Sequence, residues 1–171
     1  KDIDDKGDFY TETVSKIYKE YQEVCKRDHL VDFGELLLKY YETIKTSHSV
    51  KTFFQTRFQS ILIDEFQDTN TIQYKWLQEI TSDKTNITAV GDDDQSIYGW
   101  RGAKVEHVNS FTEDFKATEV VRLEQNYRST DIILNAANAL IDNNKDRLGK
   151  NLWTEKKEGE QIVLYQAYNE Q

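Results

Sequence analysis

The sequence predicts an α/β fold, a parallel sheet flanked by helices, that follows an N-terminal all-helical segment. From Ser60 onward, short apolar runs alternate with helix-length segments, which is the pattern of βαβ units in a parallel sheet. Residues 1–58 instead carry apolar side chains at helical spacing. In addition, a cluster of polar side chains directly follows each of three predicted strands, which indicates a functional edge of the sheet.

Three helices are predicted in the N-terminal segment. Residues 9–27 carry apolar side chains close to helical spacing. Asp32 and Glu35 form an aspartate variant of the capping box before a run of leucines, so a second helix is expected to begin near Asp32 and to end at the polar residues 45–49. A third, short helix is predicted from three phenylalanines, Phe53, Phe54 and Phe58.

Four strands and three further helices are predicted after residue 59. The strands are the apolar runs Ile61–Ile63, Ile87–Val90, Val120–Leu123 and Ile162–Tyr165. The helices are expected at about Thr71–Ile80, near Lys104–Phe111 and from Ile132 to Ile141. Ser129 or Thr130 is expected to cap the last helix, and the polar residues 142–160 are interpreted as a connection.

The three polar clusters are Asp64–Asn70, Gly91–Arg101 and Gln125–Arg128. Because the carboxyl ends of parallel strands meet at one edge of a sheet, the clusters are expected to lie close together. In the first cluster, Asp64 can hold Mg²⁺ directly or through water. Glu65 can orient and deprotonate a water molecule. For these two residues alone, a solvated acidic turn is the competing interpretation.

The second cluster combines an amide with aromatic and cationic side chains. Gly91 is expected to relax the turn that leaves the strand. Gln95 can report a γ-phosphate, or it can simply stabilise the turn. Tyr98, Trp100 and Arg101 offer stacking surfaces and positive charge, which single-stranded nucleic acid requires. Burial in a core is the alternative for Trp100, but its position between two glycines predicts an exposed ring.

The third cluster offers a second pair of the same kind. Tyr127 has a stacking face, and Arg128 is a cation that can stabilise charge on a transferring phosphoryl group. Its alternative is an ordinary helix N-terminus, where an arginine is mildly unfavourable against the helix dipole. The phosphate-binding loop Gly-x-x-x-x-Gly-Lys-Ser/Thr does not occur in the chain, so the sequence holds the metal, base and sensor half of a nucleotide site but not the phosphate half.

Composition narrows the class of protein. The 171 residues carry a formal net charge of −9, and the single cysteine, Cys25, excludes an internal disulfide framework and suits a cytoplasmic protein. Cys25 is expected to be a small core residue, and one cysteine with three histidines makes a zinc site implausible. No apolar run has the length of a membrane span. The absence of methionine indicates a piece of a longer chain.

Three segments resemble motifs II, III and IV of the UvrD/Rep/PcrA helicases, superfamily 1 ATP-dependent DNA helicases of bacterial repair and replication restart. These segments are residues 64–69, 91–103 and 123–129, in the order and spacing of the family. The resemblance runs from about Leu30 to the end of the chain and includes the shorter segments 31–36 and 148–153.

The resemblance implies a RecA-like motor of the P-loop NTPase type, with ATP bound between two domains. By this analogy, residues 1–56 correspond to the end of a helical insertion called domain 1B. Residues 57–125 correspond to the C-terminal part of the first RecA-like domain, and residues 126–171 to the start of the second.

The resemblance also implies a role for each matched side chain. Asp64 would coordinate Mg²⁺, Glu65 would activate the attacking water, and Gln95 would couple the γ-phosphate to the DNA-binding segment. Tyr127 would stack on adenine, and Arg128 would reach the γ-phosphate across the domain cleft. The residues expected to line the path of single-stranded DNA are Tyr98, Trp100 and Arg101.

The family further implies 3′→5′ translocation, single-stranded and duplex DNA as substrates, and other repair or replication proteins as partners. Because the P-loop lies outside this chain, we expect the chain alone to be inactive. Strand edges left without their neighbours are expected to cause some self-association.

Two other functions are open at this point. The first is a two-metal nuclease that uses the carboxylates Asp64, Glu65, Asp68 and Asp92–Asp94. It gives no role to the arginines or to the aromatic residues beside them. The second is a non-catalytic module that binds nucleic acid or protein and has kept the fold.

Overall fold

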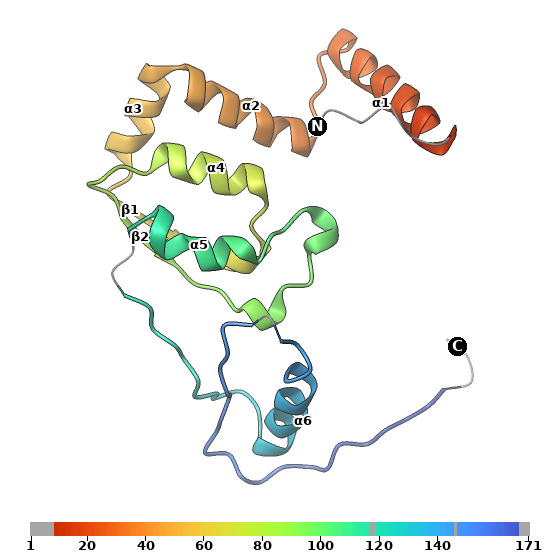
Figure 1. The fold of residues 1–171 in the computed structure, drawn as a ribbon, viewed down its shortest axis with the longest axis vertical. Helices are drawn as coiled ribbons and strands as arrows, with labels where there is room; N and C mark the ends of the chain where they lie inside the picture. Colours follow the sequence, from red (N-terminus) through yellow and green to blue (C-terminus); the bar gives the residue numbers. More distant parts are fainter. Residues whose placement is uncertain (1–8, 117–118, 146, 168–171) are drawn as a thin grey trace.

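The structure is a computed structural model that describes residues 9–116, 119–145 and 147–167 (Figure 1). The first eight residues of the predicted helical segment therefore lie outside the described residues. Helices α2 to α5 lie together with a small sheet in one half of the molecule, α6 lies in the other half, and α1 projects to one side (Figure 1). This arrangement confirms the predicted α/β class with an N-terminal helical segment.

The helical segment consists of α1 (Phe9–Arg27), α2 (Phe33–Thr46) and α3 (His48–Arg57). Asp32 caps α2 as expected, because its Oδ1 accepts a hydrogen bond from the backbone N–H of Glu35 at 2.7 Å. Ser47 ends α2 and begins α3: its backbone N–H donates to the carbonyl of Thr43, and its side chain accepts from the N–H of Val50. One polar residue therefore separates the two helices. Cys25 is buried, as expected.

The sheet has two parallel strands, β1 (Ser60–Ile63) and β2 (Asn86–Ala89). Helix α4 (Thr71–Ile80) makes the crossover between them and begins with a complete capping box from Asn70 and Gln73. The strands are in register, with Ile61 opposite Ile87 and Ile63 opposite Ala89. These four side chains face the helices, whereas Leu62 on the other face is exposed. Among the described residues, helices cover only one face of this sheet.

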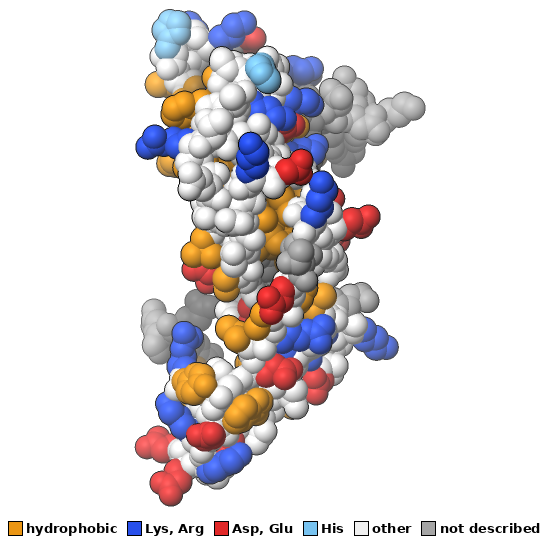
Figure 2. Space-filling model, turned by 90° about the vertical axis from the view of Figure 1, so that its left-hand side faces the viewer, with side chains coloured by type: hydrophobic (Ala, Val, Ile, Leu, Met, Phe, Trp, Pro, Cys, Tyr) orange, Lys and Arg blue, Asp and Glu red, His pale blue; other side chains and the backbone are white. Residues whose placement is uncertain are grey.

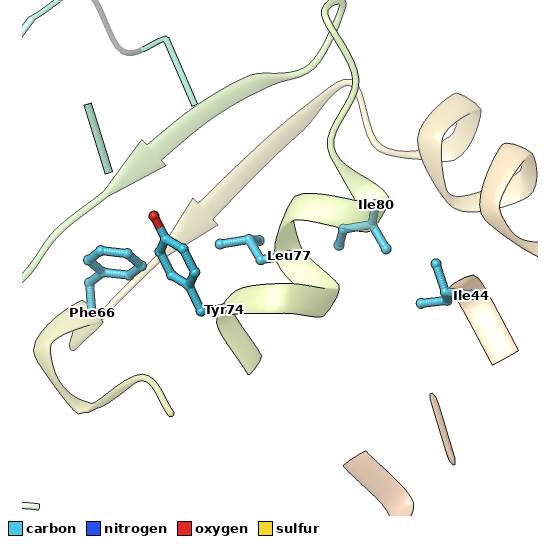
Figure 3. Packing of buried hydrophobic residues seen from close by; sticks show 5 residues of the cluster. All are labelled: Ile44, Phe66, Tyr74, Leu77 and Ile80. Carbon is cyan, nitrogen blue, oxygen red and sulfur yellow. The ribbon is translucent and has the colours of Figure 1, made fainter. Parts of the chain in front are cut away.

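The core lies between this sheet face and α2, α4 and α5 (Glu106–Asp114). Figure 3 shows its five buried members, which come from α2, α4 and the turn after β1: Ile44, Phe66, Tyr74, Leu77 and Ile80. The ring of Phe66 meets that of Phe111 edge-on, with the centroids 5.0 Å apart. This contact anchors the residues after β1 between the sheet and α5, so packing in the core fixes the position of the turn that begins the candidate site.

The described residues from 119 onward contain α6 (Asp131–Ile141) and long stretches without regular structure. The predicted strands Val120–Leu123 and Ile162–Tyr165 are wrong. A strand needs a neighbouring backbone, and among the described residues neither segment pairs with one; an isolated bridge between Gln125 and Trp153 lies just beyond the first. Leu164, for example, is 95% exposed.

Two smaller expectations need correction. Helix α5 begins and ends two to three residues later than the apolar pattern indicated. Thr130 is the N-cap residue of α6, but its side chain makes no capping hydrogen bond. Instead, the side-chain oxygen of Asn126 accepts from the backbone N–H groups of Arg128 and Ser129 just before the helix.

The surface carries many apolar side chains. Figure 2 shows hydrophobic groups along one face, interspersed with charged groups of both signs. None of the helices in the described ranges combines the length and the apolar character that a membrane crossing requires.

Candidate nucleotide and nucleic-acid site

The first two polar clusters meet at the carboxyl edge of the sheet, as expected. The backbone N–H of Val90 donates to the carbonyl of Ile63 at 2.8 Å, and the N–H of Phe66 donates to the carbonyl of Val90 at 3.0 Å. These bonds continue the parallel pairing beyond the strands. They hold the turn after β1 against the segment after β2.

Asp64 and Glu65 lie at the start of this turn with exposed side chains. The backbone N–H of Glu65 donates to Oδ1 of Asp64 at 2.9 Å. Glu65 has a φ of 49°, a left-handed conformation that costs free energy for a residue with a side chain. Non-glycine residues with such backbones concentrate at functional sites.

A pocket of about 260 Å³ opens beside the two carboxylates, and Asp68, Gln73 and Trp76 also line it. Oδ1 of Asp68 and Nε1 of Trp76 are buried and have no hydrogen-bond partner among the described residues. Buried polar atoms normally have partners, so these two leave the wall of the pocket incompletely satisfied.

Gln67 connects the two clusters and was missed by the sequence analysis. Its side chain is fully buried, with 1% of its surface exposed. Nε2 donates to Oε2 of Glu65 at 2.7 Å, and Oε1 accepts from the backbone N–H of Asp92 at 3.0 Å. Its position inside the motif at residues 64–69 was visible in the sequence, but its partner lies 25 residues away.

Gln95 has an exposed side chain and belongs to a short 3-10 turn, η2 (Asp93–Gln95). Its Nε2 donates to Oδ2 of Asp92 at 2.7 Å. Partial burial acts to raise the pKa of Asp92, but hydrogen bonds from Lys150 and Gln95 and the charge of the lysine outweigh it, so the pKa lies below its ordinary value. Asp92 therefore holds Gln95 as a charged acceptor at neutral pH.

The carboxylates of Asp92, Asp93 and Asp94 lie close enough together to hold a cation, with one oxygen of each within 4.8 Å of the others. The chain itself supplies the positive partners. Arg147 donates to both oxygens of Asp94, and Lys150 pairs with Asp92. All three aspartates accept hydrogen bonds from residues 147–150, since the backbone N–H of Leu148 donates to Asp93. Arg147 and Lys150 are therefore further residues of this region that sequence reasoning missed.

Tyr98, Trp100 and Arg101 form one aromatic and cationic group around a second 3-10 turn, η3 (Gly99–Arg101). The guanidinium carbon of Arg101 lies 4.5 Å from the centroid of the Trp100 ring and 5.0 Å from that of Tyr98. Trp100 is 75% exposed, which confirms the expected exposed ring. A planar base can therefore reach its face.

The third cluster is connected to the second only through another segment of the chain. The hydroxyl of Tyr127 donates to Oε1 of Gln125 at 2.7 Å, and the Tyr127 ring and Arg128 are exposed. The backbone N–H of Asn151 donates to the carboxylate of Glu124, so the segment around Lys150 joins this cluster to the second. Within the described ranges, Arg128 makes no ion pair with either of the other clusters.

Two family models match the sequence in succession. The model for the UvrD/REP helicase N-terminal domain matches residues 1–116, and that for the UvrD-like helicase C-terminal domain matches residues 121–171. The chain therefore carries parts of both.

Curated relatives agree with these models. The chain is 54% identical over 169 residues to DNA helicase II of Haemophilus influenzae, which covers 99% of the chain and 23% of the relative. DNA helicase II of Escherichia coli is 54% identical over 164 residues, 96% of the chain and 23% of the relative. The ATP-dependent DNA helicase PcrA of Staphylococcus aureus is 42% identical over 163 residues, 95% of the chain and 22% of the relative. The chain thus spans about a quarter of the length of these relatives.

Proposed function

The chain belongs to the UvrD/REP helicase family, and from this we propose that it is a segment of an ATP-dependent DNA helicase. The whole protein would move 3′→5′ along single-stranded DNA, unwind duplex DNA, and act in DNA repair or replication restart. The observation that carries this proposal is the hydrogen-bonded edge of the sheet, where Glu65 is connected to the segment that bears Gln95.

The residues at this edge suit a magnesium-nucleotide complex. The Asp64 carboxylate is exposed at the end of a strand and makes no ion pair with another described residue, so it can hold Mg²⁺ beside substrate phosphates. The metal would neutralise charge on the phosphates. Glu65 would orient and deprotonate the attacking water, and Gln95 would contact the γ-phosphate. Because the chain lacks a P-loop, the remaining phosphate contacts must come from elsewhere in the protein.

Tyr127 and Arg128 would complete the site from the other side. We assign to Tyr127 the stacking face for adenine, and to Arg128 the cation for the γ-phosphate. Both side chains are exposed, and Arg128 has no competing anionic partner among the described residues. An arginine that approaches late can stabilise charge in the transition state.

The group of Tyr98, Trp100 and Arg101 would contact single-stranded DNA. Its exposed ring and adjacent guanidinium combine base stacking with phosphate attraction. These residues follow Gln95 closely in the sequence. A movement of Gln95 at the nucleotide would therefore be transmitted to the DNA contacts over a few residues.

The test is ATP hydrolysis by the full-length protein that carries this sequence, with and without single-stranded DNA. We expect DNA to stimulate hydrolysis and Glu65→Gln to lower kcat by about 10²–10⁴-fold, the range of a general base. Glu35→Gln is the matched control, because Glu35 lies on α2 and pairs with Lys39. If hydrolysis is absent, or if it is indifferent to DNA and to Glu65, the result would favour a non-catalytic interaction module.

The nuclease alternative is less well supported. It requires the carboxylates of Asp92–Asp94 for metal ions, but Arg147 and Lys150 already pair with two of them. Cleavage of DNA that depends on Mg²⁺ and not on ATP would favour it.

The proposal also includes the cellular location and the protein partners. We propose a cytoplasmic protein that meets other repair or replication proteins. We also propose self-association of the 171-residue chain, because each strand of the two-stranded sheet has one edge without a neighbour among the described residues. A sedimentation coefficient that does not change with concentration would contradict self-association.

A further inference from the structure

We propose that Gln67 is a positioning residue that fixes the carboxylate of Glu65 and links it to the loop that carries Gln95. The inference rests on the proposed function, since it gives Gln67 a part in the hydrolysis assigned to Glu65. Gln67 does not touch the substrate in this account, because its side chain is fully buried behind the turn.

The hydrogen-bond chemistry defines how the Gln67 amide is oriented. The backbone N–H of Asp92 can only donate, so it must face Oε1 of the amide. This leaves Nε2 toward Oε2 of Glu65, which can only accept when ionised. Both ends of the amide are therefore used, and the opposite orientation would lose both bonds. Oε2 of Glu65 is held by Gln67, and no described residue donates to the other oxygen, Oε1, which can accept a proton from water.

Gly91 provides the space for this arrangement. A Cβ atom at Gly91 would lie 2.8 Å from Oε1 of Gln67, and 3.2 Å and 3.3 Å from the backbone nitrogens of Phe66 and Gln67. Gly91 does not have a positive φ, so its expected role in relaxing the turn is replaced by close approach of two segments. The glycine, the buried amide and the left-handed Glu65 thus form one local arrangement.

The same contacts continue to Gln95. The backbone N–H of Asp92 donates to Oε1 of Gln67, and its carboxylate accepts from Nε2 of Gln95 at 2.7 Å. A hydrogen-bonded path therefore runs from Glu65 through Gln67 and Asp92 to Gln95. A displacement of the Gln95 loop would disturb the bonds of the buried amide, and an unpaired buried amide is unfavourable. Through this path, the position of the Gln95 loop and that of Glu65 become dependent on each other.

The test uses Gln67→Glu in the full-length protein. The new carboxylate still accepts from Asp92 but repels Glu65 in place of donating to it. We expect kcat of DNA-stimulated ATP hydrolysis to fall about 10- to 100-fold, the effect of a misplaced catalytic group, while the KM for ATP changes less than about twofold. Gly91→Ala places a methyl group too close to Oε1 of the same amide and should also lower kcat.

Gln55→Glu is the matched control for a purely structural role. Gln55 on α3 donates to the backbone carbonyls of Glu79 at 2.9 Å and Thr81 at 3.3 Å, so the same substitution breaks partly buried hydrogen bonds away from the site. It should lower the unfolding temperature and leave kcat unchanged. If Gln55→Glu lowers kcat as much as Gln67→Glu does, the positioning role is overturned.

Combining Gln67→Glu with Glu65→Gln separates this inference from the proposed function. If Gln67 acts through Glu65, the double variant should hydrolyse ATP in single turnover no more slowly than Glu65→Gln alone. Multiplied losses, or a wild-type kcat in Gln67→Glu while Glu65→Gln is inactive, would overturn the inference and leave the proposed function standing. Wild-type activity in Glu65→Gln would overturn the proposed function itself.

Discussion

Arg147 donates two parallel hydrogen bonds to Asp94, from Nε to Oδ1 at 2.9 Å and from Nη2 to Oδ2 at 2.6 Å. Both side chains are largely buried, with 14% and 12% of their surfaces exposed. Asp94 belongs to the part of the chain matched by the N-terminal family model, and Arg147 to the part matched by the C-terminal one. The pair therefore joins the two parts next to the candidate nucleotide site.

Removing Arg147 should loosen this junction. Arg147→Ala leaves the largely buried carboxylate of Asp94 with only the longer ion pair to Lys150 at 3.9 Å, and we expect a cost of about 2–4 kcal/mol to the contact between the two parts. Hydrogen exchange of the segment after α6 should become faster. The control is Arg27→Ala, because Arg27 pairs with Asp28 on an exposed surface. Equal protection in the wild type and Arg147→Ala would contradict a stabilising role for the pair.

Trp100 is predicted to contribute directly to DNA affinity. Trp100→Ala in the full-length protein removes a stacking face and should weaken binding of a single-stranded oligonucleotide by about 1–3 kcal/mol. Fluorescence anisotropy with a labelled oligonucleotide measures the change. Phe33→Ala removes another highly exposed ring, on α2, and should have no effect. If both variants bind like the wild type, the aromatic group does not contact DNA.

His107 should make the stability of the part that packs around the two-stranded sheet depend on pH. Its ring stacks on Tyr74 with centroids 4.1 Å apart. Burial, and then the nearby charge of Lys104, lower its pKa, while Glu106 and Asp114 oppose them only in part. The folded state thus favours the neutral ring, and Nε2 is buried with no hydrogen-bond acceptor for it among the described residues.

The sign of the effect follows from proton binding. Between the lowered pKa and the ordinary value of about 6.5, the unfolded chain binds more protons, so stability is present above about pH 6.5 and falls as the pH drops. His107→Phe keeps the stacked ring without the titration. Thermal unfolding at about pH 7.5 and about pH 5.5 should show a larger loss for the wild type than for this variant. An equal loss in both proteins would contradict the assignment.

The purified 171-residue chain should not hydrolyse ATP. It contains the proposed metal ligand and base, but no P-loop to hold the phosphates. Phosphate release should stay at the background rate with Mg²⁺ and single-stranded DNA present. Hydrolysis that Glu65→Gln abolishes would show that the chain binds the nucleotide by some other means.

Local features of the fold were predictable because their causes lie within a few residues. The start of α2 depends on Asp32 and Glu35, which are three residues apart and form the expected bond. The strands at Ile61 and Ile87 were recognised because both are apolar and a helix of suitable length lies between them. From parallel pairing alone, the first two polar clusters had to share an edge.

The errors arose where a partner distant in sequence decides the outcome. Val120–Leu123 and Ile162–Tyr165 have the composition of strands, but among the described residues neither has a backbone to pair with. Gln67 and Arg147 find their partners 25 and 53 residues away, respectively, and their composition gave no signal of those contacts. The roles of Asp64, Glu65, Gln95, Tyr127 and Arg128 remain predictions.

Strand separation by the full-length protein with ATP and Mg²⁺ tests the helicase proposal most directly. The substrates are a duplex with a single-stranded 3′ tail and the same duplex with a 5′ tail. We expect the wild type to unwind the 3′-tailed duplex much faster than the 5′-tailed one, and Glu65→Gln to unwind neither. Absence of ATP-dependent unwinding in the wild type, or equal unwinding by Glu65→Gln, would contradict the helicase proposal.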